Sequence, residues 1–206
     1  MNVRIQYPIS FTAGIYYNGM LRMNNYTARL WMMTNTMDPD CHTIAVDRLN
    51  YFIYNCIDST VFFGPKDLHQ AQAYANVGLN VTTLPGDPVD QLIGIMLYHK
   101  IEAIVEEQLL LGEIEISSSL GEGIVYMHAE NENISDLNIP EWWTTSDLVH
   151  CDLDLIDTDK VVTMHQSSVW RDLKLAWPNE TDDKKLDTDT GNTVVFADFK
   201  RNNDKE

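Results

Sequence analysis

The chain has 206 residues, of which 31 are acidic and 14 are lysine or arginine, so its formal net charge is −17 at pH 7. Hydrophobic residues make up 44% of the sequence and aromatic residues 10%, which is more than a disordered acidic tail contains and enough for the core of one ordinary domain. A charge this negative argues against direct binding of nucleic acid, because such proteins neutralise phosphates with lysine and arginine.

The acidic residues are distributed unevenly along the chain. Residues 1–100 hold seven acidic and six basic side chains, whereas residues 101–206 hold 24 acidic and eight basic ones. The first half is therefore almost neutral, and the second half carries nearly all of the negative charge. Asymmetry of this kind concerns solubility and partners, so a function has to account for the second half.

The N-terminus and the cysteines set expectations about location. The N-terminus lacks the apolar region of a secretory signal, and no stretch approaches 18 uninterrupted apolar residues, so we expect a cytoplasmic protein that does not bind membranes. No two of the three cysteines (Cys41, Cys56 and Cys151) have the spacing of a CxxC motif. We expect them to be reduced and mostly buried.

The first sixty residues predict a β-ribbon followed by a helix. Residues 3–9 and 26–34 have the alternation of strands, and Tyr17-Asn18-Gly19 supplies a turn between them. Apolar residues then recur at helical spacing over residues 44–57, with Arg48 among the polar residues off that face.

The next sixty residues predict a βαβ unit, a long helix and a hairpin. Residues 60–63 and 79–84 read as strands on either side of a helix over 67–77, and this order suggests a right-handed unit with both strands in one sheet. Asp87 is a natural N-cap for a helix that ends near Gln108. Alternation over 113–116, followed by residues 124–128, predicts a hairpin with one acidic, wet face and one packed face.

Regular patterns fade after residue 131. Residues 148–156 suggest an acidic edge strand, residues 193–199 a last strand, and residues 200–206 a disordered tail. We therefore predict one α+β domain over residues 1–199, with a mixed sheet, a central βαβ-like unit, about three helices and an irregular acidic C-terminal third.

Three segments resemble uncharacterised proteins of large tailed bacteriophages. They are residues 83–94 (TLPGDPVDQLIG), 118–121 (SSLG) and 141–143 (EWW), and together they span roughly the central third of the chain. The resemblance implies a host-cell or virion setting. It implies no activity and no catalytic residue.

One row of side chains suggests a metal site. His99, Glu102 and Glu106 fall within an arc of about 60° on the predicted helix, since each residue advances about 100°. Such a row could ligate a divalent metal ion if the following hairpin supplied Glu113, Glu115 or His128. A solvated helix face is the alternative.

An acidic row in the second half has three interpretations. It consists of Asp147, Asp152, Asp154, Asp157 and Asp159. The row could bind Ca²⁺ or Mg²⁺, although it lacks the glycine and terminal glutamate of an EF-hand loop. It could instead imitate a nucleic-acid backbone before a basic protein surface, or it could be a soluble edge.

Two further candidates come from loops. Lys66 and the threonines Thr82 and Thr83 lie at the C-terminal ends of the two strands of the βαβ unit, where open α/β sheets bind ligands; capping and turn formation are the alternative. Trp142 and Trp143 could anchor a protein interface, as could Trp170 with Trp177, and we expect at least two of these four to pack in the core.

Together these patterns favour a non-enzymatic acidic factor whose second half binds a basic surface of a host or viral protein that handles nucleic acid. No cofactor is needed for that function. The alternatives are a divalent-metal-dependent hydrolase or nuclease, and a structural or assembly protein of a virion. The sequence leaves the oligomeric state open.

Overall fold

The computed structural model describes residues 3–35, 38–130, 132, 134, 137, 139–148 and 169–178. The predicted strands over 148–156 and 193–199, the predicted tail and Cys151 lie largely or wholly outside these ranges. In chain order the elements are β1 (Arg4–Tyr17), β2 (Met20–Thr34), α1 (Pro39–Tyr51), a π-helical turn (Phe52–Ile57), β3 (Val61–Phe63), a 3-10 turn (Pro65–Asp67), α2 (Leu68–Asn76), β4 (Val81–Thr83), α3 (Asp90–Val105), β5 (Leu109–Ser118), β6 (Val125–Ala129), a 3-10 turn (Glu141–Thr144) and α4 (Val169–Asp172).

Six strands form one mixed sheet in the order β4-β3-β1-β2-β5-β6. The pairs β1–β2, β2–β5 and β5–β6 are antiparallel, whereas β3 runs parallel to both β1 and β4. Asn18 and Gly19 close the β1–β2 ribbon with positive φ angles of 51° and 75°, a conformation that these two residue types adopt readily. The predicted α+β architecture with a mixed sheet is thereby confirmed.

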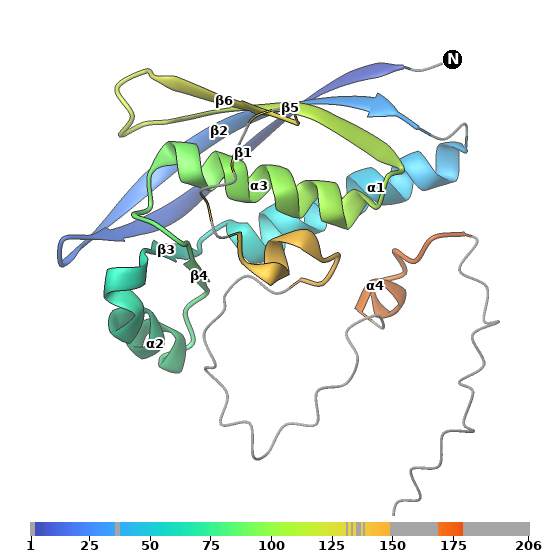
Figure 1. Ribbon diagram of the computed structural model, residues 1–206. Coiled ribbons are helices and arrows are strands. Elements are labelled where there is room, and N and C mark those ends of the chain that lie inside the picture. Colours follow the sequence, from blue (N-terminus) through green and yellow to red (C-terminus); the bar gives the residue numbers. More distant parts are fainter. Residues whose placement is uncertain are drawn as a thin grey trace, which may run out of the picture.

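The βαβ unit predicted from residues 60–84 is also present. α2 connects β3 to β4, and Val61 to Phe63 pair in parallel with Val81 to Thr83. The unit is inserted between α1 and α3, so it extends the sheet beyond β1 (Figure 1).

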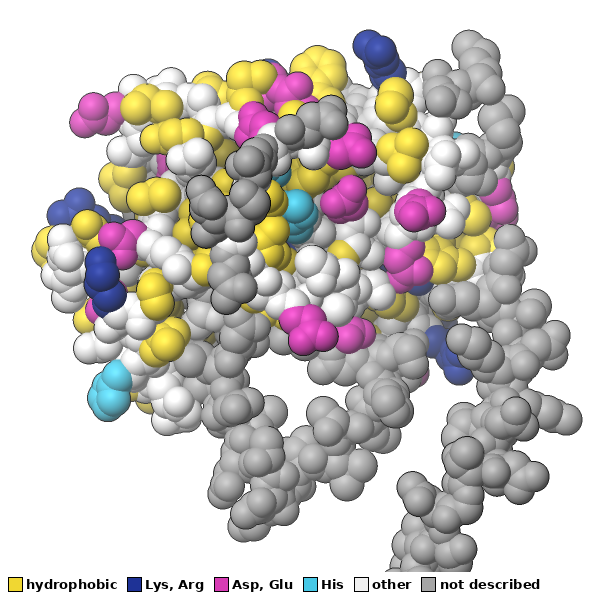
Figure 2. Space-filling view, in the orientation of Figure 1, with side chains coloured by type: hydrophobic (Ala, Val, Ile, Leu, Met, Phe, Trp, Pro, Cys, Tyr) yellow, Lys and Arg dark blue, Asp and Glu magenta, His cyan; other side chains and the backbone are white. Residues whose placement is uncertain are grey.

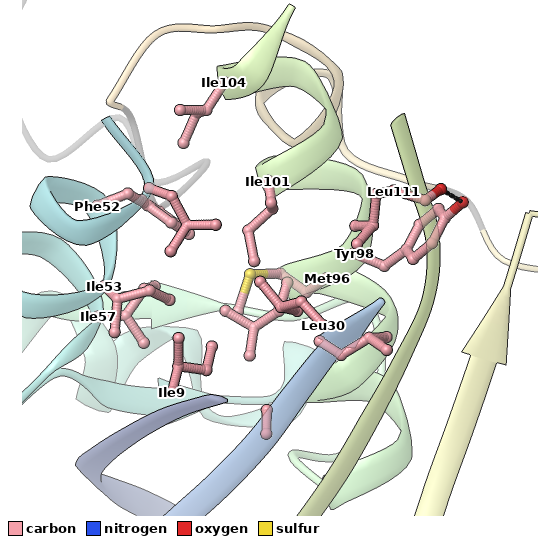
Figure 3. Close-up of a cluster of buried hydrophobic side chains, with 14 of the residues drawn as sticks. Ile9, Leu30, Phe52, Ile53, Ile57, Met96, Tyr98, Ile101, Ile104 and Leu111 are labelled. Carbon is pink, nitrogen blue, oxygen red and sulfur yellow. Dashed lines mark hydrogen bonds between the residues drawn. The ribbon is translucent and has the colours of Figure 1, made fainter. Parts of the chain in front are cut away.

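Helices α1 and α3 cover one face of the sheet, which we call the inner face (Figure 1). Figure 3 shows how side chains from the sheet and from the helices point toward one another there: Ile9 and Leu30 from the strands, Ile53 from the π-helical turn, and Met96 with Ile101 from α3. These residues are buried and form the main core. At its margin the Tyr98 hydroxyl donates to the carbonyl of Leu111 at 2.9 Å.

Helix α3 begins later than the sequence suggests. Asp90 is its first residue, and Val89 rather than Asp87 occupies the N-cap position. The backbone N–H of Val89 donates to the carbonyl of Asp87 in a preceding turn, and the carboxylate of Asp87 faces Lys66 at 3.4 Å. Asp87 therefore serves the turn and an exposed ion pair, and does not cap the helix.

The opposite, outer face of the sheet is covered only at one end within the described chain. There α2 packs on β3 and β4, where Phe63, Ala71 and Val81 form a second small cluster with Tyr16 and Tyr74. Over β2, β5 and β6 none of the described helices lies on this face (Figure 1).

The basic side chain of Arg48 lies in the interior, whereas the helical pattern places it among the polar residues off the apolar face. Arg48 is 1% exposed, and its guanidinium lies between the rings of Trp170 and Trp177, 4.8 and 3.8 Å from their centroids. Its Nε donates to the carbonyl of Leu175 at 2.7 Å, and Nη1 donates to Glu106 at 3.0 Å. Arg48 thus fastens residues 169–178 to the helices.

The π-helical turn continues α1 directly. Its buried residues (Phe52, Ile53, Cys56 and Ile57) face the core. At its end the N–H of Asp58 donates to the carbonyl of Ile53, and the Asp58 carboxylate accepts from the N–H of Thr12 on β1 at 2.8 Å.

The described helices are all too short or too polar to cross a membrane.

Candidate functional site

The predicted metal row is divided by the end of α3. His99 and Glu102 lie together, with Nδ1 and Oε2 3.9 Å apart. Glu106 follows the helix in a left-handed conformation with φ of 47°, and its carboxylate binds Arg48 at 3.0 Å and the indole N–H of Trp177 at 2.7 Å. Glu106 therefore belongs to the Arg48 contact, and the prediction that it joins His99 and Glu102 in one row is wrong.

His128 of the hairpin takes the place next to His99. The two imidazole rings are 5.7 Å apart, and the ring of Tyr98 contacts both at 5.4 and 4.8 Å. His128 Nδ1 is 2.9 Å from Glu132 Oε2. A cluster of His99, Glu102, His128 and Glu132 thus joins α3 to β6.

The cluster shifts the ionisation of its members. Burial lowers the pKa of His99, and the neighbouring His128 lowers it further. Burial also raises the pKa of Glu102, with a smaller rise from Glu130 and an opposing effect of His128. Both shifts favour the neutral forms of the two groups, because burial penalises a charge.

The hairpin carboxylates point away from this cluster. Glu113 and Glu115 pair with Ala129 and Met127 on the outer face of the sheet, whereas His128 pairs with the buried Ile114. Within the described ranges, no three His, Cys, Asp or Glu side chains are arranged to hold a metal ion. The residues proposed as metal ligands are thus separated: His99, Glu102 and His128 lie on the inner side of the sheet, and Glu113 and Glu115 lie on the outer face. Glu106 binds Arg48.

The predicted interface tryptophans lie in the core. Trp142 and Trp143 are buried in a 3-10 turn that packs against α3. Lys100 of α3, which is 0% exposed, fixes this turn by donating to the carbonyls of Trp142 and Thr145 at 2.8 Å each and to that of Asp147. Trp142 and Trp143 are therefore wrong as surface anchors, because the lysine draws their segment inward.

The acidic row is described at one residue. Asp147 lies half-buried at the end of the segment that Lys100 holds. Asp152, Asp154, Asp157 and Asp159 lie outside the described residues, so their binding role stays a prediction.

The two loops of the βαβ unit lie side by side, as predicted from the parallel strands. A Cβ atom on Gly64 would be only 3.0 Å from the carbonyl oxygen of Gly86. Lys66 is paired with Asp87, and the hydroxyl of Thr82 lies 3.0 Å from that of Thr60. These contacts match the alternative of turn formation, since each polar group named already has a protein partner.

The open part of the outer face is a feature that sequence patterns did not single out. Large apolar side chains stand exposed on it beside β5 and β6, including Trp31 at 40%, Val125 at 54% and Met127 at 57%. Arg29 and Glu115 form an ion pair of 2.8 Å among them. A signal is present in the sequence, because Met23, Trp31 and Met127 each stand next to a residue that faces the core and so lie on the opposite side of the strand.

The stretch of chain that contains β5 and β6 is rich in acidic residues. From residue 101 to residue 159 the sequence contains fifteen acidic residues and no lysine or arginine, and this stretch includes β5, β6 and their connection. Figure 2 shows acidic side chains spread across the helical face of the molecule, with lysine and arginine near its margins. The predicted acidic face of the hairpin is present on β5, where it carries Glu113 and Glu115, but on β6 the same face carries Val125, Met127 and Ala129.

Comparison with known proteins finds partial similarity to a few solved structures. No protein-family model matches the chain, and no curated protein matches it. An uncharacterized protein from Wolinella succinogenes is similar over 64% of this chain and 99% of its own, with 9% identity and a TM-score of 0.47. Two structures of 6-pyruvoyltetrahydropterin synthase from Plasmodium vivax are similar over the same shares, with 11% identity and a TM-score of 0.41. Neither likeness assigns an activity to this chain.

Proposed function

We propose that this protein is a non-enzymatic acidic factor that binds a basic surface of another protein through the part of its surface built from residues 101–159. The observation that carries the proposal is the absence of lysine and arginine from the sequence of that stretch, in which fifteen acidic residues precede, lie within or follow the β5–β6 hairpin along the chain. Exposed carboxylates at both ends of β6, on Glu122 and Glu130, extend this field beyond the strands.

Such a surface supports fast and selective association. Complementary charge steers two proteins toward encounter and repels partners of like charge, and salt weakens both effects. The nearly neutral first half supplies β1 to β4 and α1, the larger part of the scaffold that holds the hairpin in place.

The phage resemblance defines the setting that we propose. In the cytoplasm of an infected cell, host and viral proteins that handle nucleic acid present basic grooves, because they have to neutralise phosphates. An acidic surface of fixed shape is complementary to such a groove.

The test is association of the full chain with partners from a host lysate at two salt concentrations, about 50 mM and about 300 mM. We expect basic partners to be recovered at low salt and lost at high salt. The association rate of a recovered partner is then measured with Glu113→Gln/Glu130→Gln and with the matched control Asp40→Asn/Asp47→Asn. The first variant should slow association several-fold and the control should not, although both remove two exposed or half-exposed charges.

A set of partners indifferent to salt contradicts the proposal. Equal effects of the two double variants contradict it as well, because net charge alone would then explain the binding.

A further inference from the structure

Strand β6 ends the sheet, and part of its backbone faces away from β5. The N–H of Glu130 donates to the carbonyl of Gly112, in line with the β5–β6 register. Because bonded and non-bonded pairs alternate in an antiparallel ladder, the bonds to β5 come from Tyr126 and His128, and the N–H and C=O groups of Val125, Met127 and Ala129 point away from β5. Of these outward groups, the carbonyl of Ala129 accepts from the N–H of Glu132 at 3.0 Å. No described strand lies on that side.

This edge lacks the features with which proteins discourage strand addition. Such features are lysine, proline, a bulge or a very short strand. β6 reads Val-Tyr-Met-His-Ala, and its register with β5 is continuous. The opposite edge of the sheet differs, since β4 has only three residues, all buried.

Acidic side chains surround the edge on both faces of the sheet. Glu113 and Glu115 lie one strand away on the outer face, where Glu115 is ion-paired with Arg29 at 2.8 Å and Glu113 is half-buried. On the inner side Glu102 and Glu132 are 51% and 54% exposed, and their described ion pairs are with histidines. A strand added to β6 would lie about 4.8 Å from it, so long basic side chains on either face could reach these carboxylates.

We propose that β6 binds an extended, lysine- or arginine-rich segment of a partner protein as a seventh strand of the sheet. Backbone hydrogen bonds to Val125, to Met127 and to the N–H of Ala129 supply affinity, and the surrounding carboxylates select the basic sequence. The inference rests on the proposed function and deepens it by naming the form of the partner.

A second copy of this chain fits the edge less well. Two β6 strands paired antiparallel about Met127 would bring Glu122 of one copy near Glu132 of the other, twice. Each copy also carries a net charge of −17.

The experiment uses the full chain and a fluorescein-labelled peptide of about nine residues in which lysine and valine alternate, a length typical of strands. Its control is the same peptide with every backbone nitrogen methylated, which keeps the charges and removes the N–H donors. Binding is followed by fluorescence anisotropy. The wild-type chain should bind the first peptide at least about tenfold more tightly than the second, because only the first can form a ladder.

Two variants of the edge complete the test. Met127→Pro removes an outward N–H that β5 does not use, and proline is tolerated at such edge positions. Met127→Thr keeps the N–H and shortens the side chain. We expect Met127→Pro to weaken peptide binding about tenfold and Met127→Thr to leave it within about threefold, at melting temperatures close to that of the wild type.

The outcomes separate this inference from the proposed function. Equal, salt-sensitive binding of both peptides overturns strand addition and leaves an acidic binding surface. Binding of neither peptide, while the lysate partners still depend on salt, overturns strand addition alone. A dimer in sedimentation that Met127→Pro dissociates shows that β6 pairs with a second copy, which also overturns it.

Discussion

The ionisation of Lys100 gives a quantitative test of the described core. Burial lowers the pKa of Lys100 from 10.5 to about 8, against smaller opposing effects of Asp147 and Cys56. The unfolded chain keeps the proton up to about pH 10.5, whereas the folded chain releases it from about pH 8. Between these values the unfolded state binds more protons, so the free energy of unfolding rises with pH.

The size of this rise is set by the two titrations. Integration between about pH 7 and about pH 9.5 gives a gain of about 2 kcal/mol from Lys100 alone. The variant Lys100→Met has similar length and no titrating group, so this gain disappears. Its effect at pH 7 is a separate quantity, since it combines the loss of three hydrogen bonds with relief from a buried charge.

Urea unfolding at the two pH values measures the effect. The informative quantity is the change in the free energy of unfolding between the two pH values, compared between wild type and Lys100→Met. The contributions of the other titrating groups cancel in this comparison. Cys56 needs a control, because burial raises the pKa of its thiol from 9.0 to about 11. As the pH rises toward about 9.5, the unfolded chain loses this proton before the folded chain does, so the thiol lowers the free energy of unfolding. Both chains are therefore compared with and without Cys56→Ala. An unchanged pH slope in Lys100→Met would refute the burial of this lysine.

Three further predictions concern the same fold. Trp177→Phe keeps a ring over Arg48 but removes the hydrogen bond to Glu106, so it should lower the free energy of unfolding by about 1–2 kcal/mol in urea titrations. Trp177→Leu also removes the ring and should lower this free energy by about 3 kcal/mol. Equal losses in the two variants would contradict the stacking of Trp177 on Arg48. Gly94→Ala places a methyl group 2.8 Å from Ile116 Cγ2 and should cost about 1–3 kcal/mol, a loss that Ile116→Ala should partly offset in a double-mutant cycle. Because the pKa of His99 is lowered, stability should fall as pH drops through about 6.5, and His99→Gln should reduce that loss in titrations from pH 7 to 5.

Periodicity predicted most of the elements because burial follows it. The ribbon, the βαβ unit, α3 and the hairpin each repeat apolar residues at the spacing that one covered face requires. β5 extends further than predicted, from Leu109, since Leu109 and Leu111 are buried on the inner face before the alternation of Glu113 begins.

The candidate site was less predictable because its contacts join distant residues. Arg48 is buried by partners about 60 to 130 positions away, and helical periodicity places it on the polar side. Trp142 is held inward by Lys100, whose carbonyl partners carry no side-chain signature. The sequence indicates His128 only as one possible metal ligand, and its position beside His99 depends on how the hairpin crosses α3.

The π-helical turn after α1 affects how the chain tolerates changes in length. A turn with i→i+5 bonds contains one residue more than the α-helical turn that could replace it. Deleting a single residue within Phe52–Ile57 would remove this extra residue and let α1 continue as a regular α-helix, with little rotation of the residues that follow. Asp58, whose carboxylate accepts a hydrogen bond from the N–H of Thr12, would then keep nearly its present direction. A one-residue deletion should therefore be tolerated better within this turn than within α1, where it would rotate every later residue by about 100°.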